Sequence, residues 1–427
     1  MNALVIFTLL AVLMLTGMPI SISLGLTVLT FLFTMTDVPL ESVALKLFTG
    51  IEKFEIMAIP FFILAGNFLT HGGVAKRMIN FATSMVGHWY GGLGLAGVLA
   101  CALFAAVSGS SPATVVAIGS ILLPAMVKAG FPNKFGAGVI ATSGALGILI
   151  PPSIVMVMYS VATNTSVGAL FMAGVIPGLA LACVLGAVTW YRAKKFNYPR
   201  QPKATWGERW KAFRASVWGL LLIGVVMGGI YSGIFTPTEA AAMSAVYAFI
   251  CAVFIYKDLG MKDVPKVLLN SANMSAMLLY IITNAVLFSF IMTNENIPQA
   301  LADWMLGNGL GVITFLLAVN VILLLAGNFM EPSSIVLIFA PILFPVAIAL
   351  GIHPVHFGIL MVVNMEVGMC HPPVGLNLYV ASGITKMGIT ELTVAVWPWL
   401  LSMLGFLVVV TYWPDLSLWL PRTMGML

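Results

Sequence analysis

Long apolar stretches alternate with short polar segments along the whole chain. A helix needs about 20 apolar residues to cross the hydrocarbon layer of a bilayer. The stretches that approach or reach this length are Asn2–Thr16, Ile20–Met35, Phe54–Leu69, Phe135–Ala162, Ala169–Tyr191, Val217–Phe235, Ala240–Tyr256, Ser271–Met292, Phe357–Ser382 and Leu392–Trp413. We therefore expect an all-α polytopic membrane protein.

Two other apolar stretches, Gly92–Lys128 and Gly311–Leu350, are interrupted halfway by small and polar residues. The interruptions are Ser108–Pro112 and Gly327–Ser334. Backbone groups without hydrogen-bond partners cannot face lipid, so such a break must be buried in protein or line a cavity. We expect two re-entrant helical hairpins, over residues of about 92–130 and 311–350, with their tips near the middle of the membrane.

Helix-breaking residues recur at a constant spacing of 221 residues, for example from 124 to 345. The pairs are Pro124 and Pro345, Gly130 and Gly351, Gly147 and Gly368, Pro151 and Pro372, Pro152 and Pro373, and Pro177 and Pro398. The spacing predicts two repeats, residues 1–200 and 217–427, joined by a basic cytoplasmic linker over 201–216. Each repeat would contain one hairpin and one broken helix, the latter over about 135–162 and 355–382.

The orientation of the repeats follows from the positive charges. The segment Arg192–Arg214 carries eight Lys or Arg residues and a single acidic residue, Glu208. Loops rich in Lys and Arg stay in the cytoplasm. Counting membrane crossings from this segment places the bases of the two hairpins on opposite sides, so the repeats have inverted topology. Inverted repeats with discontinuous helices are typical of secondary transporters.

Composition supports a membrane protein and removes other classes. Hydrophobic residues make up 61% of the 427 residues and charged residues 8%, against about 25% charged residues in soluble domains. A cytosolic enzyme and a secreted disulfide-linked domain are excluded. The net charge of +5 is concentrated in one segment between apolar stretches, so it indicates membrane orientation and not nucleic-acid binding.

The hairpin tips and the opposing helix breaks contain the candidate binding residues. Proline removes a backbone donor and displaces a carbonyl one turn earlier, and the freed oxygens can bind a cation. We expect sodium to bind at Ser108, Gly109, Ser110, Ser111, Gly144, Gly147, Gly327, Asn328, Gly368 and Pro372. We expect substrate at Ser153, Ser333, Ser334, Asn377 and Glu331. Kinks of this kind often serve packing alone, but four at symmetric positions favour binding sites.

Two acidic residues, Glu331 and Glu366, lie near the proposed site. A carboxylate inside a bilayer is costly unless it is paired or functional. Both residues can be interpreted as proton carriers or as protonated structural residues, and the sequence does not decide between these roles. No Walker A sequence, catalytic triad or zinc-binding pattern occurs. We therefore expect neither an ATP-driven pump nor an enzyme, and no cofactor beyond a coupling sodium ion.

Inverted repeats permit two mirror-related states of similar energy. We expect the hairpins and broken helices to move together against the outer helices, as in an elevator-type transporter. The amphipathic stretches Lys76–Tyr90 and Glu295–Leu306 would join the moving part to the rest. The outer segments Asp37–Lys53 and Thr293–Gly311 are expected to be polar loops that dock a partner outside the membrane.

Four stretches closely resemble the large membrane subunit of tripartite ATP-independent periplasmic (TRAP) transporters, the DctM-like family. They are Ile59–Gly66, Val107–Thr114, Gly147–Ser153 and Phe235–Ala241, and the resemblance extends over essentially the whole chain. The resemblance implies sodium-driven uptake of a carboxylate, such as a C4-dicarboxylate or sialic acid, across a bacterial inner membrane. It also implies two partners, a periplasmic substrate-binding protein and a separate small four-helix (Q-type) membrane subunit. A freestanding ion-coupled carboxylate transporter or sodium/proton antiporter is the alternative.

Overall fold

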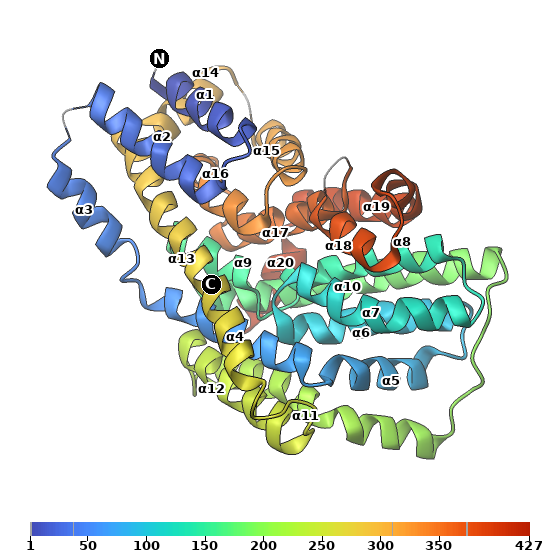
Figure 1. Cartoon of the computed structure of the whole chain (residues 1–427). Helices are drawn as coiled ribbons and strands as arrows, with labels where there is room; N and C mark the ends of the chain where they lie inside the picture. The colour runs from blue at the N-terminus through green and yellow to red at the C-terminus, as the bar shows by residue number, and fades with distance from the viewer. Residues whose placement is uncertain (1, 37, 310, 373–374) are drawn as a thin grey trace.

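The computed structural model describes residues 2–36, 38–309, 311–372 and 375–427 (Figure 1). These residues form helices and connecting turns, with no strand among them. The first part of the chain contains α1 (Asn2–Leu15), α2 (Ile20–Met35), α3 (Leu40–Thr49), η1 (Phe54–Met57), α4 (Ala58–His71), α5 (Val74–Val86), α6 (Gly92–Ser108), α7 (Ser111–Lys128), α8 (Asn133–Ser143), η2 (Gly144–Ile148), α9 (Ile154–Thr163) and α10 (Val167–Lys195). The predicted all-α class is confirmed.

The second part of the chain repeats much of this order. It contains α11 (Trp206–Tyr231), α12 (Pro237–Ile250), η3 (Cys251–Ile255), α13 (Val264–Asn294), α14 (Ile297–Gly307), α15 (Val312–Gly327), α16 (Pro332–Ala349), α17 (Pro354–Cys370), α18 (Leu376–Thr385), α19 (Ile389–Tyr412) and α20 (Asp415–Thr423). Within the described residues, eight helices are long and apolar enough to cross a membrane, and six further apolar helices are shorter.

Both predicted hairpins are present. Helices α6 and α7 form the first hairpin, and their junction at residues 108–111 is named tip 1. Helices α15 and α16 form the second, and their junction at residues 327–332 is named tip 2. The breaker residues paired by the constant spacing also match structurally, since Gly130 and Gly351 both have positive φ angles, of 89° and 78°. Pro124 and Pro345 both lie inside the second helix of a hairpin.

Both predicted broken helices are also present, but they differ from each other. Break 1 spans residues 144–153, between α8 and α9, and begins with the 3₁₀ turn η2. Break 2 is shorter and covers residues 371–375, of which Pro373 and Val374 lie outside the described residues. Break 2 starts later in its helix than break 1 does, because α17 continues to Cys370. Where break 1 has Gly144, the equivalent position of α17 is Met365, a much better helix former.

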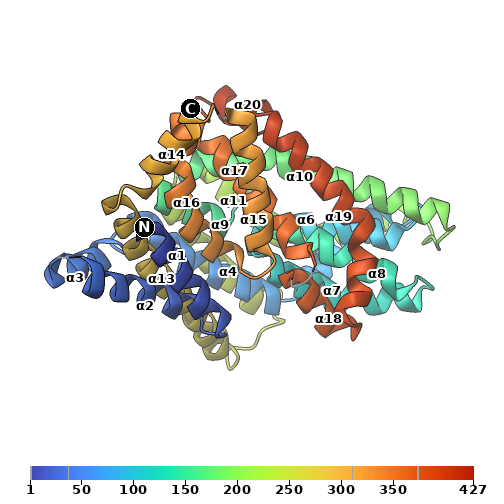
Figure 2. The ribbon, with the colours of Figure 1, turned by 90° about the horizontal axis from the view of Figure 1, so that it is seen from above.

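The helices form two packed groups (Figure 2). The group named the block contains both hairpins, both broken helices, α10, α19 and α20; in it α8 packs against α19, and α9 against α16. The group named the frame contains α1–α5 and α11–α14; in it α4 packs against α12, and α2 against α13. Each group therefore combines elements from both halves of the chain.

The two predicted amphipathic stretches are helical and lie where the groups meet. Helix α5 packs against α6 of the block and α11 of the frame. Helix α14 packs against α16 of the block and α13 of the frame. Their apolar faces thus contact both groups at once.

Three expectations for the segments between spans need correction. The segment Asp37–Lys53 is not a loop, since α3 occupies most of it, with Val43 and Leu47 on its inner face; Asp37 lies outside the described residues. Most of the expected 201–216 linker is helical, because α11 begins at Trp206 behind a capping box formed by Thr205 and Glu208. Helix α20 was not expected after the last apolar span.

Candidate functional site

A cavity of about 360 Å³ lies between the two hairpin tips and the frame. Tip 1 and the start of α7 contribute Gly109, Ser110, Ser111, Pro112 and Ala113, and tip 2 contributes Glu331, Pro332 and Ser333. The frame closes the other side with Asn67, Thr70, Met274, Met277 and Leu278. Hairpin tips from both halves of the chain therefore line a single cavity.

Helix N-termini supply the electrostatic character of this cavity. Helix α7 begins at Ser111 and α16 at Pro332, and both residues line the cavity. The first N–H groups of a helix have no partner inside the helix and carry partial positive charge. Neither Ser110 nor Glu331, the residues before these helices, caps them with its side chain. The N-termini are thus suited to an anionic group placed between them.

Tip 1 is attached to break 1 by a network of neutral oxygens. The Ser111 hydroxyl donates to the Gly144 carbonyl at 2.9 Å and lies 3.1 Å from Asn377 Oδ1. Asn377 Nδ2 donates to Ser111 Oγ at 2.8 Å and to the Ala141 carbonyl at 3.2 Å. The hydroxyl, amide and backbone carbonyl oxygens of this network are hard, uncharged ligands of the kind that bind alkali cations.

Glycine is required where tip 1 touches break 1. A Cβ atom on Gly147 would lie 2.5 Å from the Ser110 carbonyl oxygen. Gly109 has a φ of 60°, and a Cβ there would lie 2.9 Å from the Pro152 carbonyl oxygen. Two backbones can approach this closely only without side chains between them.

Tip 2 meets the second broken helix through a similar glycine pair. A Cβ on Gly327 would lie 2.9 Å from Gly368 Cα, and one on Gly368 would lie 3.0 Å from Gly327 Cα. Asn328 directly follows Gly327, and its Oδ1 lies 2.9 Å from Nδ1 of His371, which is three residues past Gly368. The asparagine oxygen thus belongs to the contact between tip and break.

Behind the second break lies a buried amide network that the sequence did not reveal. Asn364 Nδ2 donates to Asn320 Oδ1 at 2.9 Å and to the Asn320 carbonyl at 3.0 Å. Asn320 Nδ2 donates in turn to Thr411 Oγ1 at 2.9 Å. The network joins α15, α17 and α19 of the block. Its only sequence signal is polar residues scattered in mainly apolar helices.

The predicted site residues are divided between the cavity wall and the layer behind it. Those lining the cavity are Gly109, Ser110, Ser111, Glu331 and Ser333. Those in the tip-to-break contacts behind it are Gly144, Gly147, Gly327, Asn328, Gly368 and Asn377. The Ser108 hydroxyl lies 2.9 Å from Thr114 Oγ1, inside the first hairpin. Ser153 is the buried N-cap of α9, Ser334 donates to Glu331 Oε1 at 3.3 Å, and Pro372 lies in break 2. Their roles toward sodium and substrate stay predictions.

Glu366 is buried in the block without a cation beside it. Its side chain is fully inaccessible, and neither oxygen has a hydrogen-bond partner by distance and angle within the described residues. No ion pair of the described residues includes it. An unpaired carboxylate charge in such surroundings is strongly disfavoured. The surroundings therefore suit a neutral side chain.

One lysine bridges the frame and the block. The Lys53 ammonium donates to the Val161 carbonyl and, at 2.8 Å, to Asn164 Oδ1 at the end of α9. Burial lowers the pKa of Lys53, and the nearby Glu55 carboxylate partly opposes this shift. A cation is favourable at the C-terminus of a helix. This contact must break if the block moves relative to the frame.

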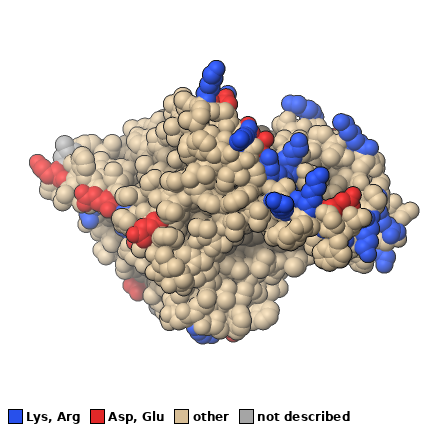
Figure 3. All heavy atoms as spheres, turned by 90° about the horizontal axis from the view of Figure 1, so that it is seen from below, with Lys and Arg blue, Asp and Glu red and all other residues tan. Residues whose placement is uncertain are grey.

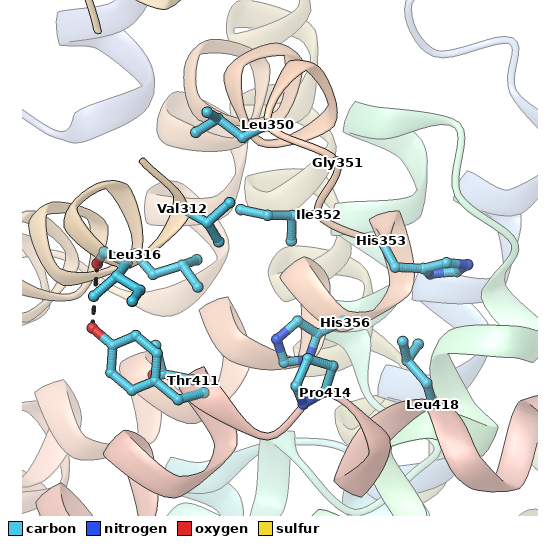
Figure 4. A pocket seen from close by; sticks show the side chains of 12 residues that line it. Val312, Leu316, Leu350, Gly351, Ile352, His353, His356, Thr411, Pro414 and Leu418 are labelled. Carbon is cyan, nitrogen blue, oxygen red and sulfur yellow. Dashed lines mark hydrogen bonds between the residues drawn. The ribbon is translucent and has the colours of Figure 1, made fainter. Parts of the chain in front are cut away.

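Larger cavities exist away from the tips. One of about 670 Å³ lies at the ends of α15, α17 and α19 and is lined mainly by apolar side chains, with His353 and His356 among them (Figure 4). Burial and the nearby Arg422 lower the pKa of His353. Another cavity, of about 690 Å³, lies between α14 and the second hairpin, beside their packing contact. Neither includes a residue of either tip, so size alone does not identify the site.

Comparison with known proteins identifies the family of the chain. Residues 7–416 match the family described as "Tripartite ATP-independent periplasmic transporter, DctM component". The chain is 76% identical, over the full length of both, to the C4-dicarboxylate TRAP transporter large permease protein DctM of Rhodobacter capsulatus. It is 36% identical to the sialic acid TRAP transporter large permease protein SiaM of Vibrio cholerae, over 95% of each chain.

The fold also resembles a solved structure. The YdaH transporter of Alcanivorax borkumensis matches with a TM-score of 0.64 over 90% of this chain and 88% of that one. The sequences are 15% identical, so the similarity concerns the fold alone. The family inferred from the tip and break motifs is confirmed by the match over nearly the whole chain. The protein belongs to the DctM family, the large membrane permease component of TRAP transporters.

Proposed function

We propose that the protein imports a C4-dicarboxylate across a bacterial inner membrane, coupled to sodium. The cavity between the two hairpin tips is the observation that carries this proposal. Its uncapped N-termini, of α7 and α16, would each face one carboxylate of a short dicarboxylate. The residues that line it include no Lys or Arg, so helix dipoles, hydroxyls and bound cations would have to balance the substrate charge.

Relatives favour the dicarboxylate over the larger sugar acid. Proteins that are 76% and 54% identical, from Rhodobacter capsulatus and Pseudomonas aeruginosa, are named as C4-dicarboxylate permeases. The relative named for sialic acid is 36% identical. Because the cavity wall combines residues of the tips, break 1 and the frame, substrate choice would follow the relatives that share most of this sequence.

Sodium would bind in the tip-to-break contacts and not in the cavity itself. Ser111, Gly144 and Asn377 already bring three oxygen atoms together at tip 1. Asn328 supplies an amide oxygen beside the close backbone contact of tip 2. A cation in either place would fix a hairpin tip in the position that forms the substrate cavity. Binding of sodium and of substrate would therefore favour each other.

The division into block and frame supports an elevator movement. The cavity lies between the two groups, with α4 and α13 of the frame facing the tips. Sliding of the block would carry the cavity past these helices and expose it on the other side of the membrane. The hydrogen bond from Lys53 to Asn164 would stabilise the block in one of the two end positions of this movement.

Two partners complete the proposed system. A periplasmic substrate-binding protein would deliver the dicarboxylate, and a small four-helix membrane subunit would pack on the lipid-facing side of the frame. A relative from Oleidesulfovibrio alaskensis, named isethionate TRAP transporter permease protein DctMQ, is 41% identical, and the match covers 97% of this chain but 65% of that protein.

Substrate competition tests the proposed substrate. Proteoliposomes would contain the permease, its small subunit and its binding protein, with labelled succinate outside. We expect unlabelled fumarate and malate to compete, and sialic acid and acetate not to compete. Equal competition by sialic acid would contradict a cavity specific for short dicarboxylates. Full transport of free succinate without any binding protein would instead favour a freestanding transporter.

A further inference from the structure

The connection between the two halves of the chain carries a dense group of cations. The group, named the basic ledge, lies at the end of α10, in the following connector and in the first turns of α11. Its members are Arg192, Lys194, Lys195, Arg200, Lys203, Arg209, Lys211 and Arg214. Figure 3 shows Lys and Arg side chains gathered on one side of the molecule and most acidic side chains on the other. The ledge thus concentrates positive charge at one edge of the helix bundle.

These cations are not neutralised by the protein. In the described part of the chain, ion pairs involve Arg77, Lys134 and Arg422 and no member of the ledge. The single acidic residue of the segment, Glu208, accepts hydrogen bonds from the Thr205 backbone and hydroxyl as a helix cap. Lys194, Lys195, Arg200, Lys203, Lys211 and Arg214 are exposed. The positive surface is therefore free to bind an external anion.

The connector that carries the ledge is held in one conformation. Tyr198 packs against Phe135 with ring centroids 4.7 Å apart, and its N–H donates to the Ala193 carbonyl at 2.9 Å. The Gln201 N–H donates to the Gly87 carbonyl at 3.0 Å, and the Arg200 guanidinium stacks 3.5 Å over the Tyr90 ring. A connector fixed in this way loses little further conformational entropy when it binds a ligand.

Exposed tryptophans indicate where the ledge lies relative to the bilayer. Trp206 is 82% exposed and Trp210 65% exposed, one turn apart at the start of α11. Tryptophan is enriched at the boundary between hydrocarbon and water. Both α10 and α11 continue from the ledge into apolar spans. The cations are thus placed at the level of lipid headgroups.

We propose that the basic ledge is a binding site for anionic phospholipid headgroups. Lys and Arg clusters directly beside membrane spans attract anionic lipids, with about a fivefold change in binding for each basic residue near the surface. The positive-inside rule accounts for the sign of the charge. It does not account for cations that are unpaired, mounted on a fixed connector and flanked by interfacial tryptophans. A phosphate from a lipid would satisfy the cations while its acyl chains contact the exposed apolar side chains nearby.

Lipid titration of the purified full-length protein, followed by native mass spectrometry, tests this site. Phosphatidylglycerol and phosphatidylcholine are the two probes, in detergent, where membrane orientation plays no part. We expect phosphatidylglycerol to bind wild type more tightly, and the triple variant Lys194→Gln, Lys203→Gln, Lys211→Gln to lose more than tenfold in affinity. The matched control removes three exposed lysines between η3 and the first turn of α13, Lys257→Gln, Lys262→Gln, Lys266→Gln, and should bind as wild type does.

A charge-preserving variant separates binding from folding. The variant Lys194→Arg, Lys203→Arg, Lys211→Arg keeps the positive charges and should bind phosphatidylglycerol as wild type does. The thermal unfolding midpoint of each variant shows whether the fold is kept. Inorganic phosphate should not displace the lipid, because its apolar contacts would be missing. Equal loss in the triple variant and the control, or equal affinity for phosphatidylcholine, would overturn the proposal.

Discussion

The hydroxyl of Ser111 and the side-chain amide of Asn377 are hydrogen-bonded at 2.8 Å although 266 residues separate them in the chain. Ser111 starts the second helix of the first hairpin, and Asn377 lies in the first turn of α18, after the second helix break. One hairpin tip is therefore attached to the broken helices of both halves of the protein. Movement of either half of the block would be transmitted to the other through this pair.

Removing the Ser111 hydroxyl should weaken sodium coupling. Ser111→Ala deletes the hydrogen bond to Gly144 and the contact with Asn377, and one such bond contributes about 1 kcal/mol. We expect the sodium concentration for half-maximal uptake to rise about five- to tenfold, with a smaller effect on binding-protein docking. Ser120→Ala, at an exposed position of the same helix, is the control. An unchanged sodium requirement would remove Ser111 from the proposed site.

A methyl group at Gly147 should disrupt the contact between tip 1 and break 1. The new Cβ would lie 2.5 Å from the Ser110 carbonyl oxygen, so one of two backbones must shift. Overpacking of this kind costs about 1–3 kcal/mol, and we expect both a lower unfolding temperature and uptake reduced at least tenfold. Gly224→Ala, which meets no atom within 4 Å, should be neutral or stabilising. If Gly147→Ala has the unfolding temperature and uptake rate of wild type, the tip 1 to break 1 contact is not tightly packed.

Cysteines at the frame-to-block bridge should report the movement. In a background without the native cysteines, Lys53→Cys with Asn164→Cys should be joined by a short, reducible bis-methanethiosulfonate reagent in the state described here, since the ends of the native side chains meet at 2.8 Å. Sodium and substrate should change the yield, and cross-linked protein should not transport until it is reduced. The control pair, Asn67→Cys with Ser271→Cys, lies within the frame at a similar distance and should cross-link under all conditions. An identical response of both pairs would contradict a moving block.

Glu366 should tolerate the loss of its charge. Glu366→Gln keeps the shape of the side chain and removes the cost of a buried, unpaired carboxylate. We expect an unfolding temperature within a few degrees of wild type and preserved sodium-driven uptake. If wild-type uptake depends on pH and uptake by the variant does not, Glu366 carries a proton. If the variant is unfolded or inactive, the charge of Glu366 is required.

The hairpins and helix breaks could be predicted because they depend on local chemistry. Ser, Gly and Pro interrupt apolar runs at residues 108–112 and 144–153, and lipid tolerates such backbone only inside protein. The constant spacing of glycines and prolines then relates the hairpin and helix break of the first half to those of the second half. The same local logic identified the cavity-lining residues of both tips.

The remaining features depend on contacts between distant segments. Asn320, Asn364 and Thr411 lie on three mainly apolar helices, and nothing local shows that they meet. Break 2 is shorter than break 1 because Met365 stands where the first half has Gly144 and lets α17 continue. The sequence predicts a loop where α3 forms, because the charged residues Glu41 and Lys46 obscure a short amphipathic pattern.

The most direct test of the proposed function measures succinate uptake into proteoliposomes that contain the permease, the small subunit and the binding protein. An inward sodium gradient would be imposed alone, and a proton gradient alone in sodium-free buffer would be imposed in a parallel sample. We predict rapid accumulation of succinate with the sodium gradient and background uptake with the proton gradient. Accumulation driven equally by protons without sodium would contradict coupling through the neutral oxygen atoms at the hairpin tips.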